Sequence, residues 1–503
     1  MSTHTESPLH LTEQRGGFTQ LIGRVLLMSL PAVLEVGDDY LEDGHSFHLG
    51  LAYMAAVLRQ NGFTVGILDC YAEDRSNVRT LIPDGWQELG LSDQSIIARI
   101  RQFSPDLIGI TIPFSCQHYV AHGVARQIKL AFPDVIITAG GNHVTAVPDK
   151  IDPALFDYLI IGEGEYAFLR LNNALNDRRP TDDIPGVKSQ AVSSDIDPEF
   201  IENLDALPFP ALDLLPIEKL WRSGKRWINM VATRGCVYDC NFCSIHTVMG
   251  YTIRRRSIEN VVAEILHWKK LYNIQEIYFE DDNLTTNQKW AKALFRRIAE
   301  GKFGIRFYTR NGIRADSIDR ELLTLMKAAG FQDFMIAPES GSQKTLDEII
   351  GKKMRLEDCT RAVQLAREVG IGINAFLVFG FPEETWEDLQ ATLSYARQLQ
   401  RLGCVGFWLS TVAPYPGTRL FQQCMEQGLL PKDVDYRKLR TVDYLIRNPH
   451  YTADELKAFR AKAMQALAPH RRSLPEQVAR GLALLIRDPA YFYAKLRYKL
   501  NIL

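Results

Sequence analysis

The sequence has no excess of charge of either sign and no long hydrophobic run. Its 58 lysine and arginine residues nearly balance 60 aspartate and glutamate residues, which leaves a formal net charge of -2. Proteins that bind nucleic acids usually carry a basic excess, so this balance argues against that class. The longest apolar stretches, such as residues 373–379, are too short to cross a bilayer. Because residues 1–17 are polar and lack the apolar core of a secretory signal, we expect a cytoplasmic protein.

Cysteine is also scarce, with eight residues in a chain of 503. That number is too small for a disulfide-stabilised scaffold of this length. In a reducing compartment, clustered cysteines more often bind metal or take part in chemistry. Five of the eight are scattered, and Cys359 and Cys404 among them are expected in the core. The other three, Cys236, Cys240 and Cys243, lie close together in one segment.

The chain from residue 24 to residue 175 predicts an open α/β sheet. Short apolar runs alternate with segments of helical apolar spacing, a pattern typical of parallel strands with right-handed crossovers. We therefore expect a doubly wound, Rossmann-like domain that binds a nucleotide or a cofactor beyond the carboxyl ends of its strands. A dinucleotide site is disfavoured, because no Gly-x-Gly-x-x-Gly follows the first strand. The expected strands are residues 25–30, 63–69, 106–112, 135–138 and 157–161, and the expected helices are 48–61, 96–103 and 119–132.

The rest of the chain predicts a linker, a barrel and a helical end. Residues 176–227 are rich in proline, aspartate and serine, which indicates a linker that passes over the surface. Six successive βα units then predict a partial (β/α)6 TIM barrel over residues 228–430, whose chemistry gathers at the carboxyl ends of the strands. Residues 431–503 are expected to be helical, and residues 1–23 to form a flexible tail. The expected barrel strands are residues 228–233, 275–280, 305–310, 333–338, 373–379 and 405–412, and the helices are 257–272, 288–300, 318–329, 343–350, 357–369 and 384–402.

The three clustered cysteines have the spacing Cys-x3-Cys-x2-Cys and follow the first expected barrel strand. A structural zinc ion would need a fourth ligand, which His246 could supply. A [4Fe–4S] cluster held by three cysteines would instead leave one iron open to a small molecule. The position at a strand end of the barrel, where substrates react, favours the open cluster.

In this segment the chain resembles the radical S-adenosylmethionine (SAM) superfamily, which carries this cysteine spacing with an aromatic residue, here Phe242, before the last cysteine. The resemblance implies that SAM chelates the open iron. It further implies that one electron from the cluster cleaves SAM to methionine and a 5′-deoxyadenosyl radical.

The resemblance continues around the barrel at successive strand ends, in the family's order. It implies that acidic residues after the second strand meet the SAM amino group, which suits an ammonium donor. It also implies an arginine for the SAM carboxylate, a ribose-binding segment and a backbone turn against the adenine. The residues implied to bind SAM are Phe242, Glu280, Asp281, Asp282, Arg310, Glu339, Ser340, Gly380 and Pro382.

Over nearly its whole length the chain resembles the cobalamin-binding class of radical SAM enzymes. The matching segments are residues 49–54, 140–143 and 162–165, whose glycines would allow close approach of a corrin and its nucleotide tail. The segment from Asp43 to His48 misses the mutase-type motif Asp-x-His-x-x-Gly, so no histidine, His45 included, is expected on cobalt. The residues implied to bind cobalamin are Phe114, Ser115, Gly140, Gly141, His143, Gly162, Glu163 and Gly164.

Within this class the chain looks most like the methyltransferases of phosphonate pathways. The implied reaction uses two SAM molecules. One methylates cobalt, and the other yields the radical that prepares the substrate to accept the methyl group. The implied acceptor is an unactivated carbon, or a phosphorus, of a small-molecule biosynthetic intermediate. A flavodoxin- or ferredoxin-type protein would supply electrons. The open alternatives are a cobalamin-dependent radical SAM enzyme that catalyses a non-methylating oxidation, cyclisation or rearrangement, and a non-enzymatic regulator that binds zinc or cobalamin.

Two basic segments carry weaker expectations. The run Arg254–Arg256 precedes an expected helix and indicates a solvated basic face. Residues 471–503 mix basic and aromatic side chains, and packing against the barrel is favoured over contact with a membrane surface.

Overall fold

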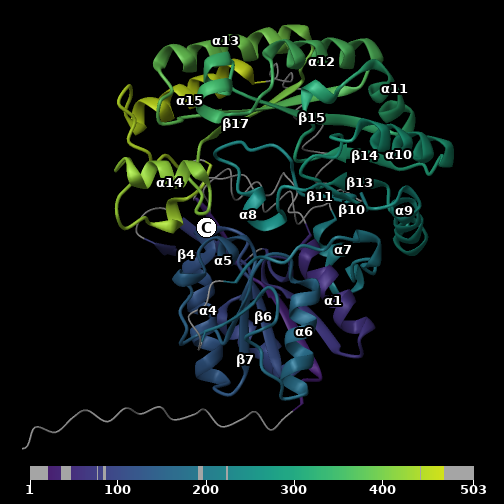
Figure 1. The fold of residues 1–503 in the computed structure, drawn as a ribbon, viewed down its shortest axis with the longest axis vertical. Helices are drawn as coiled ribbons and strands as arrows, with labels where there is room; N and C mark the ends of the chain where they lie inside the picture. The colour runs from purple at the N-terminus through teal and green to yellow at the C-terminus, as the bar shows by residue number, and fades with distance from the viewer. Residues whose placement is uncertain are drawn as a thin grey trace, which may run out of the picture.

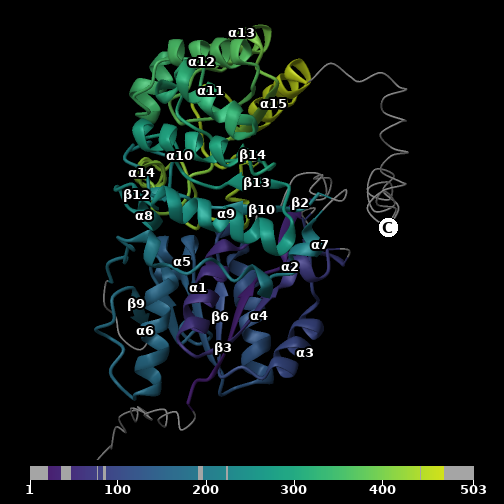
Figure 2. The same ribbon diagram turned by 90° about the vertical axis from the view of Figure 1, so that its right-hand side faces the viewer.

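The computed structural model describes residues 21–35, 47–75, 77–82, 86–190, 196–221, 225–441 and 443–468. Figure 1 shows two lobes, one of purple and blue elements from the first part of the chain and one of teal to yellow elements from the rest. Figure 2 shows that the lobes are stacked, with helices on the outer sides of both.

The first lobe is the expected doubly wound domain. Its sheet has the strand order β3-β1-β6-β7-β8-β9, and neighbouring strands are parallel except for the last pair. One apolar core lies on the side of α3 and α4, and another on the side of α1 and α6. The elements of this sheet are β1 (Arg24–Ser29), α1 (Leu49–Gln60), β3 (Thr64–Asp69), α3 (Asp93–Phe103), β6 (Leu107–Thr111), α4 (His118–Ala131), β7 (Ile136–Gly140), α5 (Asn142–Ala146), β8 (Tyr158–Ile160), α6 (Gly164–Asn176) and β9 (Val187–Ser189).

Two features of this lobe were not expected from the sequence. Strand β9 adds an antiparallel edge to the parallel sheet. A separate antiparallel sheet has the order β2-β5-β4, with strands Ala32–Glu35, Val78–Ile82 and Trp86–Leu89. These strands are three to five residues long, too short to establish a clear alternation of apolar and polar residues.

The second lobe is the expected partial barrel. Its six parallel strands run in the order β10-β13-β14-β15-β16-β17. Side chains such as Ile277, Phe279 and Phe307 point outward and pack against the helices. The strands are β10 (Trp227–Met230), β13 (Glu276–Phe279), β14 (Arg306–Thr309), β15 (Phe331–Glu339), β16 (Gly372–Phe379) and β17 (Gly406–Thr411), and the helices between them are α9 (Ile258–Tyr272), α10 (Gln288–Gly301), α11 (Arg320–Ala329), a π-helix (Thr345–Ile350), α12 (Leu356–Val369) and α13 (Trp386–Leu402).

Residues 196–221, expected to pass over the surface, are instead largely packed between the lobes. Leu204 and Leu207 contact α1 in one apolar cluster, whereas Leu212 and Ile217 join the core of the barrel. The backbone NH of Ala211 donates to the carbonyl of Ala52, 2.9 Å away. The proline and aspartate residues correctly indicated irregular backbone. The segment is buried because its leucine side chains pack against both lobes. The short elements of this segment include α7 (Ile217–Leu220).

The described part of the last region is only partly helical. The described residues of 431–452 are irregular apart from a short 3-10 turn at Tyr436–Lys438, and they follow α14 (Arg419–Glu426). Helix α15 (Ala453–Leu467) then packs against α13 and β17 through Leu456, Phe459 and Ala463. The expectation for residues 471–503 lies outside the described residues. Among the helices that the structure describes, none combines the length and the apolarity needed to cross a bilayer.

Candidate active site

The three clustered cysteines lie on a loop that a two-residue ribbon closes. Strands β11 (Thr233–Arg234) and β12 (Arg254–Arg255) pair antiparallel at its base, and α8 (Ile245–Met249) lies within it. The chain leaves β11 through Gly235, whose φ is 90°. A Cβ atom there would lie 2.3 Å from the carbonyl oxygen of Thr252, so only glycine fits the turn. We refer to residues 235–253 as the cluster loop.

The thiols of Cys236, Cys240 and Cys243 are free and half-buried. Burial is the main cause that raises the pKa of Cys243 to about 12, and the neighbouring Cys240 and Cys236 contribute to this shift. Burial also raises the pKa of Cys240, against which the charge of Lys352 acts. Burial disfavours the thiolate form, which is the form that binds metal. A positively charged metal centre would stabilise the thiolates and so offset this cost.

A multi-iron cluster and a single zinc ion require different spacings of these thiols. Among the described residues, no three histidine, cysteine, aspartate or glutamate side chains converge closely enough to hold a single metal ion. In a cubane each cysteine binds a different iron, so the thiolates stand farther apart than around zinc. His246, the possible fourth zinc ligand, has its Nε2 3.0 Å from the carbonyl oxygen of Cys236 and stacks on Tyr251.

The three acidic residues after β13 have different surroundings. Asp281 is buried, and its carboxylate accepts hydrogen bonds from the NH of Ala232 at 3.1 Å and the hydroxyl of Thr233 at 2.7 Å. Burial raises its pKa to about 7. Glu280 and Asp282 line a cavity between the lobes. Of the three residues, Glu280 and Asp282 therefore face the cavity, whereas Asp281 ties β13 to the residues after β10.

Arg310, expected to meet the SAM carboxylate, has capacity for an anion. Its guanidinium carbon lies 4.2 Å from the ring centroid of Tyr278. Its Nε is buried and has no hydrogen-bond partner in the structure. An unpaired buried donor of this kind is costly unless a ligand satisfies it, so this residue fits the predicted role.

The segment Pro338–Ser342 ends β15 in a strained turn. Glu339 has a φ of 63°, which is uncommon for a residue other than glycine. Its carboxylate lies 2.6 Å from Nζ of Lys352, and both side chains are buried. The hydroxyl of Ser340 lies 3.0 Å from that of Thr392. Both expected ribose-binding side chains thus have protein partners, and backbone strain of the kind found at Glu339 clusters at functional sites.

The expected adenine-binding turn lies against both the cluster loop and the last region. Gly380 has a φ of 99°, and a Cβ there would lie 2.6 Å from the ring of Tyr444. Pro382 is buried next to it. The ring of Phe381 meets that of Phe242 edge to face, with centroids 5.5 Å apart. The aromatic residue before the last cysteine therefore connects the cluster loop to this turn.

A buried carboxyl in this turn predicts a measurable dependence of stability on pH. Glu384 accepts a hydrogen bond from the NH of Gly380 at 2.7 Å, and burial raises its pKa from 4.5 to about 8. Between these two pH values the folded protein binds one more proton than the unfolded chain. The contribution of Glu384 to the free energy of unfolding is therefore complete below pH 4.5 and is lost as the pH rises through about 8. Glu384→Gln keeps the acceptor but does not titrate.

We subtract the melting temperature of the native protein from that of Glu384→Gln at each pH. This difference is expected to be a few degrees larger at about pH 8.5 than at about pH 5.5. Thermal unfolding followed by circular dichroism at both pH values measures this difference. Glu383→Gln, which changes the exposed neighbouring carboxylate, serves as the control and should show no such change. Equal pH dependence of all three proteins would contradict the burial argument.

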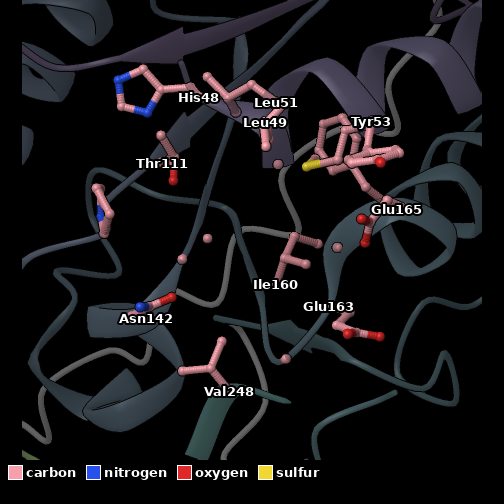
Figure 3. Close-up of a pocket in the computed structure, with 18 of the residues that line it drawn as sticks. His48, Leu49, Leu51, Tyr53, Thr111, Asn142, Ile160, Glu163, Glu165 and Val248 are labelled. Carbon is pink, nitrogen blue, oxygen red and sulfur yellow. The ribbon is translucent and has the colours of Figure 1, made fainter. Parts of the chain in front are cut away.

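A cavity of about 380 Å³ lies where the strand ends of the first lobe face the barrel. Figure 3 shows its lining side chains, with Tyr53 and Glu165 on one side and Asn142 and Val248 on another. Of the residues expected to bind cobalamin, Gly140, Gly141, Gly162, Glu163 and Gly164 line this cavity.

The cavity also reaches down between the sheet and helices α1 and α6, through residues that the sequence did not indicate. Gly109 and Thr138 form its wall on the sheet, and Leu27, Met54 and Phe168 lie around them. A glycine inside the buried strand β6 was the one available signal, because it removes a side chain from the face of a sheet. The glycine-lined space suits a flat macrocycle and a tail that inserts beside the sheet.

Phe114, Ser115 and His143 were expected at the cobalamin site but do not line this cavity. Phe114 is 60% exposed. The Ser115 hydroxyl lies 2.9 Å from Nδ1 of His143, whose Nε2 lies 2.9 Å from Nδ1 of His118. Ser115, His143 and His118 form a connected polar chain after β6 and β7. His45 lies outside the described residues.

Comparisons with known proteins agree with this geometry. Residues 230–396 match the radical SAM superfamily, and residues 40–172 match the B12 binding domain. The chain is 31% identical over 434 residues to the cytidylyl-2-hydroxyethylphosphonate methyltransferase of Streptomyces wedmorensis, over 78% of this chain and 80% of that protein. It is 32% identical over 422 residues to an uncharacterised methyltransferase of Pyrococcus horikoshii, over 82% of this chain and 86% of that protein.

The chain belongs to the B12-binding radical SAM methyltransferases. Among solved structures, the fold of this methyltransferase is similar to that of the cobalamin-dependent radical enzyme OxsB, with a TM-score of 0.69, 19% identity, and coverage of 94% of this chain and 72% of that one. It is also similar to that of TsrM from Kitasatospora setae, with a TM-score of 0.61, 20% identity, and coverage of 81% and 78%.

The expected cofactors of the methyltransferase are therefore confirmed as a [4Fe–4S] cluster, SAM and cobalamin. The residues present fit all three groups. The cluster loop provides three thiols, Arg310 offers an unpaired buried donor, and the cavity between the lobes has a glycine-lined wall.

Proposed function

We propose that this methyltransferase acts on a small phosphonate carried as a cytidylyl ester and methylates a carbon of its hydroxyethyl group. The observation that carries the proposal is the 31% identity to the cytidylyl-2-hydroxyethylphosphonate methyltransferase, which extends over 80% of that relative. Because the match extends over 78% of this chain, it includes residues of both lobes, which together hold the expected sites of all three cofactors.

The assignment of side chains to cofactors forms part of the proposal. The bound cofactors supply a radical, formed by one-electron cleavage of SAM, and a cobalt-bound methyl group. Cys236, Cys240 and Cys243 hold the cluster, Glu280 and Asp282 accept hydrogen bonds from the SAM ammonium, and Arg310 binds the SAM carboxylate. The protein further excludes water by stacking the two lobes over the cavity (Figure 2).

Two aromatic side chains on the inner face of the barrel support a substrate that carries a nucleobase. Phe376 and Trp408 are register partners on β16 and β17. Their neighbours Leu377 and Leu409 pack outward against the helices, so by strand alternation the two aromatic rings face inward. Trp408 is 47% exposed, and its open ring surface suits stacking on a pyrimidine.

The electron donor and the compartment are also proposals. A flavodoxin- or ferredoxin-type protein is a suitable one-electron donor for a low-potential cluster. All eight cysteines are free, which agrees with a reducing compartment such as the cytoplasm.

The direct test uses SAM with an isotopically labelled methyl group, cytidylyl-2-hydroxyethylphosphonate and the anaerobically reconstituted protein. We expect labelled methyl in the phosphonate product and formation of 5′-deoxyadenosine, both detected by mass spectrometry. Cleavage of SAM without label in this compound would reject the substrate.

Trp408→Ala is expected to raise KM for the cytidylyl substrate by about 10-fold, because stacking of a base on an aromatic ring contributes about 1–3 kcal/mol. Initial rates at several substrate concentrations measure the effect. Trp408→Phe retains an aromatic face and should recover most of the affinity. An unchanged KM in Trp408→Ala would exclude stacking at this position.

A further inference from the structure

The base of the cluster loop carries two buried positive charges. Arg234 and Arg254 are direct cross-strand partners in the β11–β12 ribbon. Their side chains are only 9% and 4% exposed, which corrects the expectation of a solvated basic face at Arg254. Like charges placed opposite each other destabilise a two-stranded ribbon. The β11–β12 ribbon closes the loop that holds the three cysteines. It can therefore form only where negative charge compensates the two arginines.

That opposite charge comes from the other lobe. Glu163 Oε2 lies 2.6 Å from Nη1 of Arg254, and Glu165 Oε1 lies 2.7 Å from Nη2 of Arg234. Glu163 Oε1 also lies 3.3 Å from Nη1 of Arg234, so one carboxylate connects both arginines. The two glutamate side chains are 1% and 5% exposed. Tyr53 of α1 completes the group, with its ring centroid 5.3 Å from the guanidinium carbon of Arg234.

The same two glutamates belong to a wall of the cobalamin cavity. Glu163 and Glu165 line it together with Gly162 and Gly164, and Figure 3 shows both carboxylates at its edge. The backbone here has little freedom. Gly162 has a φ of 81°, and a Cβ there would lie 2.8 Å from the carbonyl oxygen of Glu199. The NH of Glu163 donates to that same carbonyl at 3.1 Å.

One short segment with a fixed backbone thus lines the site of one cofactor and neutralises the loop that holds another. A ligand that orders the side chains of Glu163 and Glu165 fixes their carboxylates in the position that the arginines need. Ordering the cluster loop in turn fixes the arginines against the cavity wall. The second ligand to bind then meets a segment that is already ordered, which produces positive cooperativity.

We propose that Glu163, Glu165, Arg234 and Arg254 form an interdomain clamp that couples cobalamin binding to assembly of the cluster. Each cofactor strengthens binding of the other by the same factor, because the coupling free energy between two sites is reciprocal. The four are positioning residues that hold the two cofactor sites in register. This inference rests on the cofactors and not on the phosphonate substrate, so its test needs no substrate.

The test compares the dissociation constant of hydroxocobalamin for protein with and without a cluster reconstituted from iron and sulfide. In the native protein we expect the cluster to tighten cobalamin binding by about 10-fold, within the usual range of coupling between sites. Arg254→Met should reduce this ratio to about one. Arg254 does not line the cavity, so the change does not remove a direct cobalamin contact.

Arg256→Met is the matched control. Arg256 is as buried as Arg254 and forms an ion pair with Glu264, but both residues belong to the barrel. Its removal should lower the melting temperature and leave the ratio at the native value. A general loss of stability would affect both variants alike, whereas the clamp predicts a change of the ratio in Arg254→Met alone.

Two results would overturn the proposal, namely a native ratio of one or an unchanged ratio in Arg254→Met. If the methionine variant does not fold, Arg254→Gln keeps a donor towards the carbonyl of Ile201, to which Arg254 donates at 2.9 Å, and removes the charge. Hydrogen–deuterium exchange provides a second measurement. Cobalamin should slow exchange of amides in the cluster loop of the native protein and of Arg256→Met, but not of the Arg254 variants.

Discussion

Substitution of alanine for Cys236, Cys240 or Cys243 is expected to reduce cleavage of SAM below detection while hydroxocobalamin still binds. Each thiolate binds one iron, so the loss of any one leaves a cluster with two protein ligands. None of the three cysteines lines the cavity between the lobes, and the glycine-lined wall stays intact. Cobalamin should therefore bind with the lower affinity of the cluster-free protein.

The measurements are iron content, 5′-deoxyadenosine formed from SAM in the presence of a strong reductant, and the corrin absorption of the purified protein. Cys404→Ala is the matched control, because Cys404 is buried in the core of the barrel, as expected from the sequence. It should keep both the cluster and the cleavage. Cleavage that survives in any of the three variants would refute the assignment of the cluster ligands.

Gly109→Leu is expected to weaken cobalamin binding by about 100-fold or more, because it fills the space into which the tail of the cofactor would insert. A Cβ at this position would already lie 3.1 Å from a methyl of Leu27 and 3.2 Å from the ring of Phe168. The remaining carbons of leucine must then occupy the cavity, and crowding of this kind is not relieved in a close-packed interior.

Spectroscopic titration with hydroxocobalamin measures the effect. Reductive cleavage of SAM should continue in Gly109→Leu, since the cluster loop lies in the other lobe, but no methyl should reach a product. Gly123→Leu tests the same substitution on α4 of the same lobe, where a Cβ would meet nothing within 4 Å. Full retention of cobalamin by Gly109→Leu would place the tail of the cofactor elsewhere.

Periodicity was sufficient to predict the two lobes, because each strand and helix buries its own apolar residues locally. The strands of both sheets lie close to their predicted positions, as with β6 at Leu107–Thr111 and β16 at Gly372–Phe379. The three cysteines were also evident, since their spacing is local. Features that depend on distant partners were harder to predict.

The three arginines that follow the cluster loop, Arg254–Arg256, illustrate this limit. Three successive basic residues usually remain in water, because burial of an unpaired charge is very costly. Arg254 is nevertheless buried, since Glu163 neutralises it from 91 residues earlier in the chain. No local pattern contains that information. In the same way, the sequence placed Asp281 among the residues implied to bind SAM, but its hydrogen bonds from Ala232 and Thr233 after β10 give it a supporting position.

The buried segment 196–221 determines how such enzymes can be recombined. Leu204 and Leu207 complete the core beside α1, whereas Leu212 and Ile217 complete that of the barrel. A crossover point at either end of this segment would separate some of these residues from the side chains against which they pack. Chimeras that exchange one lobe between related enzymes must therefore also exchange the surface that receives this segment.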